Sequence, residues 1–140
     1  PQALASIEAW RTAAGLPNVR AAIALDAAAP AWPIAAADAV LCINMIHIAP
    51  WASAAGLVRG AAGVLPRDGV LYLYGPFRRN GAHTAPSNEA FDRSLRSRNP
   101  DWGVRDLEAI ATLAETHGFA PPLAEQMPAN NLSLVFRRLV

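Results

Sequence analysis

One apolar run constrains the fold more than any other part of the sequence. It covers residues 38–48 and reads DAVLCINMIHI. The run is rich in Val and Ile and too short for a buried helix, so it predicts a strand covered on both faces, as in parallel sheets. Ligands of open α/β sheets gather at the carboxyl ends of such strands, where Asn44 and His47 stand. The alternative is that Asn44 only bonds the following turn and that His47 is an interior histidine with satisfied hydrogen bonds.

The rest of the chain alternates between helical and strand patterns. Apolar residues at helical spacing predict helices over about 1–14, 50–65, 88–98 and 104–114, the third of them capped by Ser87 or Asn88. Short apolar runs predict further strands over 20–25, 70–74, 123–127 and 132–136. This order is typical of an α/β fold with a mostly parallel sheet, crossover helices and a C-terminal antiparallel hairpin turned by residues 128–131.

Composition and charge restrict the classes of partner. Of the 140 residues, 53% are hydrophobic and 16% are charged, which is typical of a single globular domain over residues 1–140. The net charge is +1 and there is no basic stripe, so we expect a small or neutral ligand and no nucleic acid. The single Cys42 lies in the central apolar run, which favours a buried thiol in a reducing compartment. We find neither a membrane-length apolar span nor a secretory segment, so no membrane partner is expected and the cytoplasm is the expected location.

The sequence shows no motif for metal or hydrolytic chemistry. The three histidines stand far apart and offer no pair at metal-ligand spacing, and the single cysteine has no partner. Neither a nucleophile elbow nor a phosphate-binding loop occurs. We therefore expect no metal site and no hydrolase activity.

Five short segments form a combined signature. They are CINMIHIAPW over 42–51, LYGPF over 73–77, HTAPSN over 83–88, WGVRDL over 102–107 and MPANNLSL over 127–134. With the turn VLPRDGVL over 64–71, they resemble the DUF938 family, the methyltransferase-like 26 group, across essentially the whole chain. The resemblance implies the three-layer, Rossmann-like α/β fold of class I S-adenosylmethionine-dependent methyltransferases, with a small-molecule methyl acceptor that it leaves open.

The resemblance also implies which parts of the cofactor site to expect. In the complete fold an N-terminal strand and a glycine-rich loop hold the methionine part of S-adenosylmethionine, and an acidic residue after the second strand binds the ribose. The sequence begins at Pro1 in a helical pattern, so we expect a trimmed or incomplete N-terminus and a sheet that lacks its first two strands. By position, Asp26 would face the adenine amino group and Asn44 would lie beside the methionine moiety. The alternative for Asp26 is a loop carboxylate that caps a turn.

Loops around one end of the predicted sheet supply candidates for the substrate side. These candidates are His47, Tyr74, Pro76, Phe77, His83, Ser87, Asn88, Asn130 and Asn131. His47 would line the pocket and is the one candidate for a catalytic base. Apart from such a base, methyl transfer from a sulfonium requires the protein mainly to align the cofactor and the acceptor. The alternatives are ordinary packing for Tyr74 and Phe77 and helix capping for Ser87 and Asn88. For Asn130 and Asn131 the alternative is a hairpin turn.

The expected gap in the sheet has a consequence for assembly. In the usual strand order the two absent strands lie between the strands at 20–25 and 38–48, which leaves unpaired edges. We therefore expect a homodimer, a strand-swapped oligomer or a rearranged sheet. Two functions remain open: a methyltransferase of which this chain is the part after the glycine-rich loop, or a non-catalytic binding or dimerisation module derived from that fold.

Overall fold

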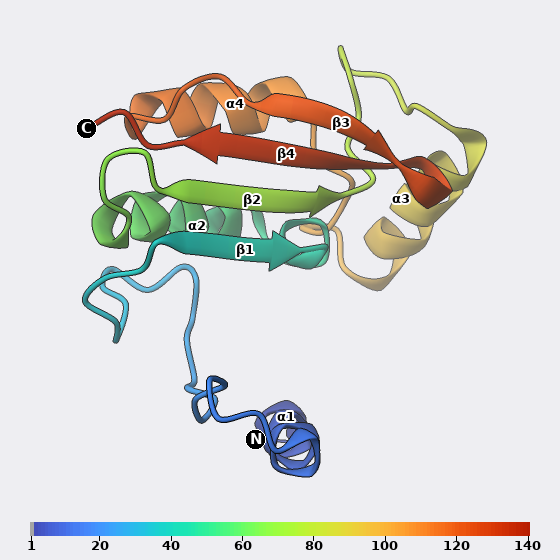
Figure 1. Ribbon diagram of the computed structural model, residues 1–140. Coiled ribbons are helices and arrows are strands. Elements are labelled where there is room, and N and C mark those ends of the chain that lie inside the picture. Colours follow the sequence, from blue (N-terminus) through green and yellow to red (C-terminus); the bar gives the residue numbers. More distant parts are fainter. Residues whose placement is uncertain (1) are drawn as a thin grey trace.

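The computed structural model describes residues 2–140, and within them it has four α-helices and one four-stranded sheet (Figure 1). The helices are α1 (Gln2–Ala14), α2 (Trp51–Val64), α3 (Pro86–Arg98) and α4 (Leu107–Thr116). The strands are β1 (Ala39–Ile43), β2 (Val70–Gly75), β3 (Leu123–Met127) and β4 (Asn131–Arg137). Two short 3-10 helices, η1 (Met45–His47) and η2 (Pro128–Asn130), follow β1 and β3. No helix of residues 2–140 combines the length and the apolar character that crossing a bilayer requires.

The strands are ordered β1-β2-β4-β3 across the sheet. β1 and β2 are parallel and are joined by the crossover helix α2, with Cys42 opposite Leu73. β4 runs antiparallel to both of its neighbours, with Leu134 opposite Leu73 on one side and Ala124 on the other. The α/β class and the C-terminal antiparallel hairpin are therefore confirmed.

The strand expected over residues 20–25 is wrong. This segment has no regular secondary structure, and its Ile23 and Leu25 are exposed. A strand needs a neighbour for its N–H and C=O groups, and among the described residues none lies beside this segment. The backbone N–H of Ala22 instead donates to the carboxylate of Glu8 in α1, at 2.5 Å. One parallel pairing therefore remains in the described sheet.

The core lies between one face of the sheet and helices α2 and α4, which Figure 1 shows together behind the strands. Leu73, Leu134 and Phe136 point from β2 and β4 to these helices and are at most 1% exposed. Figure 1 shows no helix in front of the sheet. On that open face Leu41 and Ile43 of β1 remain 66% and 60% exposed. The helical cover is thus on one side of the described sheet, and the expectation that the run at 38–48 is covered on both faces is wrong, because β1 is an edge strand.

Residues 26–34 are held against α2 by two glycines. A Cβ on Gly56 would collide with the backbone of this segment, and one on Gly60 would collide with the indole of Trp32. Arg59, between the two glycines, donates hydrogen bonds of 3.1 and 2.9 Å to carbonyl oxygens of the same segment. By contrast, α1 contributes no buried residue and lies apart from the sheet in Figure 1.

Two predicted helix starts are wrong. Ser87 and Asn88 do not cap α3, because the helix begins at Pro86 with Ala85 as its N-cap and without a side-chain capping bond. The helix expected from residue 104 begins at Leu107. Residues 103–105 are non-helical because their backbone N–H groups bond outside the helix, to His47 and Asp92.

Candidate functional site

A hollow of about 430 Å³ lies at the carboxyl ends of β1 and β2, and we call it the polar hollow. In Figure 1 this is the end of the sheet where α3 and the β3–β4 turn meet. Its lining residues come from α3, η2 and β4 and from the loops after β1 and β2; they are Asn44, Ile48, Pro76, Ser87, Asn88, Phe91, Ala129 and Asn131. Five of these were predicted from the sequence: Asn44, Pro76, Ser87, Asn88 and Asn131. The prediction missed Ile48, Ala129 and Phe91, although Phe91 stands three residues after Asn88 on the same face of α3.

Asn88 is the most enclosed polar residue of this lining, with 4% of its surface exposed. Its Nδ2 donates to the hydroxyl of Thr84 at 3.2 Å and to the carbonyl oxygen of Asn130 at 2.9 Å. The side chain of Asn130 donates in turn to the hydroxyl of Ser87 at 3.2 Å, so Asn130 contacts the rim. These bonds join α3 to η2, where Ala129 and Asn130 have φ of 57° and 59°. The left-handed region costs a residue such as Ala roughly 1 kcal/mol or more, so the bonds help to hold an unfavourable turn.

His47 follows Asn44 by three residues but does not line the polar hollow. It is fully buried, and its Nδ1 accepts the backbone N–H of Arg105 at 3.1 Å. A neutral imidazole carries one proton, so the proton of His47 lies on Nε2, which has no hydrogen-bond partner among residues 2–140. Burial, with the nearby Arg105 guanidinium, lowers the pKa of His47 to about 4. In this tautomer His47 offers a proton donor and has no free lone pair for a base.

Three other predicted candidates lie away from the polar hollow. Phe77 is 1% exposed and packs edge-on against His47, with ring centroids 4.8 Å apart, which is the packing alternative. Tyr74 stands opposite Ser133 in the β2–β4 pairing and shares the open face of the sheet with Ile43. His83 faces Asp92, with 3.7 Å between Nε2 and the carboxylate.

Asp92 of α3 is a buried charge that the sequence analysis did not single out. Its carboxylate accepts the backbone N–H of Val104 at 2.6 Å and Nε of Arg96 at 2.9 Å. Burial alone would raise the pKa of Asp92, but the bonds from Arg96 and Val104 outweigh it and lower the pKa. The available signal was the spacing of Asp92 and Arg96, which is that of a helical ion pair. Asp92 therefore ties α3 to the segment before α4.

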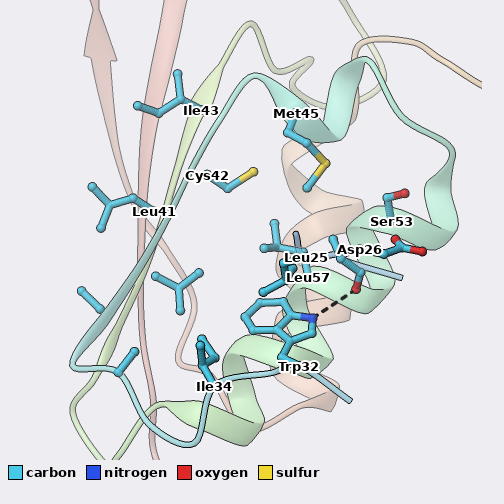
Figure 2. Close-up of a pocket in the computed structure, with 14 residues that line it drawn as sticks. Leu25, Asp26, Trp32, Ile34, Leu41, Cys42, Ile43, Met45, Ser53 and Leu57 are labelled. Atoms are coloured by element: carbon cyan, nitrogen blue, oxygen red, sulfur yellow. Dashed lines mark hydrogen bonds between the residues drawn. The ribbon is translucent and has the colours of Figure 1, made fainter. Parts of the chain in front are cut away.

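A second hollow, the apolar cleft, lies between β1 and the segment fastened to α2, and its volume is about 630 Å³ (Figure 2). Figure 2 shows Trp32, Cys42 and Leu57 within it, and Asp26 and Ser53 are among its other lining residues. Burial raises the pKa of the Cys42 thiol, which suits a neutral interior side chain. The cleft thus combines apolar walls with one carboxylate.

Asp26 and Asn44 line different hollows. Asp26 lines the apolar cleft, where one of its oxygens accepts the N–H of Ala28 at 2.9 Å, so it also caps its own turn. Asn44 lines the polar hollow, although Ile43 and Met45 on either side of it line the apolar cleft. The reason is the backbone of Asn44, which has a φ of 62° between the strand and η1. The end of β1 therefore contributes to both hollows.

Several solved structures that resemble this chain are described as methyltransferases. The S-adenosylmethionine-dependent methyltransferase SibL, in its apo form, matches 100% of this chain and 42% of its own, with a TM-score of 0.79 and 19% identity. An O-methyltransferase from neocarzinostatin biosynthesis, in complex with S-adenosylmethionine and 2-hydroxy-5-methyl naphthoic acid, matches 97% of this chain and 38% of its own, with a TM-score of 0.76 and 15% identity. An O-methyltransferase family protein from Burkholderia thailandensis matches 74% of this chain and 31% of its own, with a TM-score of 0.64 and 18% identity.

These likenesses show the fold, and the chain spans less than half the length of each structure it matches. The family model of DUF938, described as a protein of unknown function, matches residues 1–138. The family expected from the sequence is therefore confirmed, and so is the class I methyltransferase-like fold. This chain belongs to the DUF938 family.

Proposed function

We propose that this chain is the substrate-side portion of an S-adenosylmethionine-dependent methyltransferase that acts on a small molecule. The observation that carries the proposal is the polar hollow, in which Asn44, Asn88 and Asn131 from separate elements converge at the carboxyl ends of two parallel strands. Ligands of α/β sheets bind at this edge. The methyltransferase-like fold and the S-adenosylmethionine complex of one structural neighbour support the choice of cofactor.

The apolar cleft fits the adenine end of the cofactor. Trp32 and Leu57 offer apolar walls for a purine, and Asp26 has one carboxylate oxygen outside its own turn that can accept from an exocyclic amine. The cleft lining contains no cationic side chain for the carboxylate of the methionine moiety. The residues therefore fit the adenine end better than the methionine end.

S-adenosylmethionine, when bound, supplies an electrophilic methyl group on its sulfonium. The residues of this chain supply alignment: Asn44 stands between the two hollows, and Asn88 and Asn131 orient the acceptor across from it. The polar hollow is lined by amides, a hydroxyl and apolar side chains, none of which takes a proton at neutral pH. The methyl acceptor must therefore be nucleophilic enough to react without a base from this lining. His47 acts at most as a hydrogen-bond donor through its Nε2 proton.

The alternative function is a non-catalytic binding or dimerisation module, and a specific observation favours it. Asp26 and Asn44 line separate hollows, so the described residues do not form one continuous cofactor cleft. The exposed Leu41 and Ile43 on the edge strand β1 support self-association as a homodimer or strand-swapped oligomer. For either function we propose a cytoplasmic location, because the buried Cys42 is a free thiol and free thiols persist in reducing compartments.

Calorimetric titration of S-adenosylmethionine into the 140-residue chain separates the two functions. Micromolar binding that Asp26→Ala weakens at least about tenfold supports the methyltransferase, because a lost charge-assisted bond has this size. Asp101→Ala is the matched control, since this exposed carboxylate lies in the turn after α3 and lines neither hollow. No binding at millimolar cofactor, together with a dimer in light scattering, supports the module.

A further inference from the structure

We infer that Asn88 selects the methyl acceptor, and that the acceptor is an uncharged small molecule with a hydroxyl or N–H group on an apolar body. The inference rests on the proposed function, because it names the substrate class of the polar hollow. Asn88 lines that hollow, and only 4% of its surface is exposed.

The orientation of the Asn88 amide is fixed by its partners. The carbonyl oxygen of Asn130 can only accept, so the group 2.9 Å from it is the NH₂ of Asn88 and not its oxygen. The second amide proton is taken by the hydroxyl of Thr84. Both donors are therefore used inside the protein, and an amide rotated by 180° would place its oxygen against the carbonyl oxygen of Asn130.

The oxygen of Asn88 is the free group. Within residues 2–140, Oδ1 accepts no hydrogen bond. It is also not one of the fully buried polar atoms that lack a partner, so part of its surface is accessible. Since Asn88 is otherwise buried, Oδ1 opens to the polar hollow. A fixed, largely desolvated acceptor of this kind selects for a ligand with a donor, because a ligand without one leaves Oδ1 unpaired.

The charge of the lining points to a neutral ligand. The polar hollow is lined by three asparagines, a serine and four apolar residues, and none of these eight side chains is ionisable. The acidic side chains of α3 beside this lining are paired elsewhere: Glu89 forms an ion pair with Arg93, and Asp92 accepts from Arg96 and from the N–H of Val104. A carboxylate or an ammonium in the hollow would lose water without gaining a counter-charge, which is unfavourable.

Apolar side chains beside the amides provide for the body of the ligand. Ile48 and Phe91 line the polar hollow and are 45% and 37% exposed, so their surface is available to a ring or alkyl group. Pro76 adds a rigid apolar contact from the loop after β2. The donor on the ligand and its apolar body thus have separate partners in one hollow.

Three probes of one ring size test the inference on the unmodified 140-residue chain. Phenol is neutral and has a donor, anisole is neutral and has none, and benzoate is an anion. In amide-resolved NMR titrations we expect phenol to shift the Asn88 side-chain amide and the backbone of α3 saturably. We expect anisole to bind at least about tenfold more weakly, the size of one lost hydrogen bond in a desolvated site, and benzoate to cause no shift there.

Asn88→Ala adds a second readout, with Asn99→Ala at the other end of α3 as the matched control. We expect Asn88→Ala to weaken phenol about tenfold and Asn99→Ala to leave it unchanged. Equal affinity for phenol and anisole, shifts with benzoate, shifts confined to the apolar cleft, or no shift with any probe would each overturn the inference. These titrations contain no S-adenosylmethionine, so their failure is distinct from a failure of cofactor binding. If Asn88→Ala does not fold, the three probes on the unmodified chain decide.

Discussion

The backbone N–H of Arg105 donates to Nδ1 of His47 at 3.1 Å, which ties the segment before α4 to the loop after β1. Gly103 donates to the carbonyl oxygen of His47 at 2.9 Å, and between them Val104 donates to Asp92 at 2.6 Å. Three successive amides therefore alternate between His47 and Asp92, on opposite sides of one segment. The loop that carries Asn44 and the helix that carries Asn88 are thus connected through these two buried side chains.

The first prediction concerns the pH dependence of stability. The pKa of His47 is lowered from 6.5 to about 4 in the folded chain, so below pH 6.5 the unfolded state binds a proton that the folded state does not. The free energy of unfolding should therefore fall as the pH drops from 6.5 toward 4, by about 3 kcal/mol from this group. Urea denaturation at a series of pH values measures the change.

His47→Asn tests the assignment, because the asparagine oxygen can still accept the N–H of Arg105 while the titrating group is gone. We expect this variant to lose the slope between pH 6.5 and 4, and His117→Asn at the end of α4 to retain it. The low pKa of Asp92 contributes a separate loss at more acidic pH. An unchanged slope in His47→Asn would contradict the assignment.

The second prediction concerns Asp92. Asp92→Ala leaves the N–H of Val104 without its acceptor, so we expect a loss of about 2–3 kcal/mol in the free energy of unfolding. Glu89→Ala is the matched control, since Glu89 forms an exposed ion pair with Arg93 on the same helix, and it should cost below about 1 kcal/mol. Equal losses in the two variants would show that the bond to Val104 contributes little.

The third prediction concerns the side chain of Arg105, which fastens the loop after β1. Its guanidinium donates to the carbonyl oxygens of Ile46 at 2.9 Å and Ala49 at 2.6 Å, and it lies 5.8 Å from the ring centroid of Trp51. Arg105→Met keeps the length of the side chain and removes these donors, so we expect a loss of about 2 kcal/mol or more. Arg98→Met removes one exposed bond and should be nearly neutral in the same denaturation experiment.

Local patterns were sufficient to predict the elements that have partners within the chain. The apolar run at 39–43 and the strands over 70–75 and 131–137 pair with one another, so period and propensity gave the correct answer. The segment at 20–25 has a similar apolar pattern but no neighbouring strand, and an apolar pattern alone does not satisfy backbone groups. Pairing is a long-range property that no window of sequence contains.

The site was predictable only as a set of loops. Asn44, Pro76 and Asn131 follow or begin strands whose ends meet, so their convergence on the polar hollow follows from topology. The separation of Asn44 from Asp26 depends instead on one left-handed backbone conformation, which the sequence does not specify. The bonds of His47 and Asp92 to residues 103–105 connect positions far apart in sequence, and they were equally inaccessible to pattern analysis.

The fourth prediction concerns the segment that carries Asp26. Gly60 lies against the Trp32 indole, so Gly60→Ala forces the helix and the segment apart, and we expect a loss of about 1–3 kcal/mol in the free energy of unfolding. Gly63→Ala is the control on the same helix: its Cβ meets nothing within 4 Å, and it should raise stability by roughly 0.5–1 kcal/mol. The indole N–H resonance of Trp32 should shift in Gly60→Ala and stay in place in Gly63→Ala. If both variants keep that resonance and both gain stability, residues 26–34 are not held on α2, and Asp26 has no fixed position from which to accept an adenine amine.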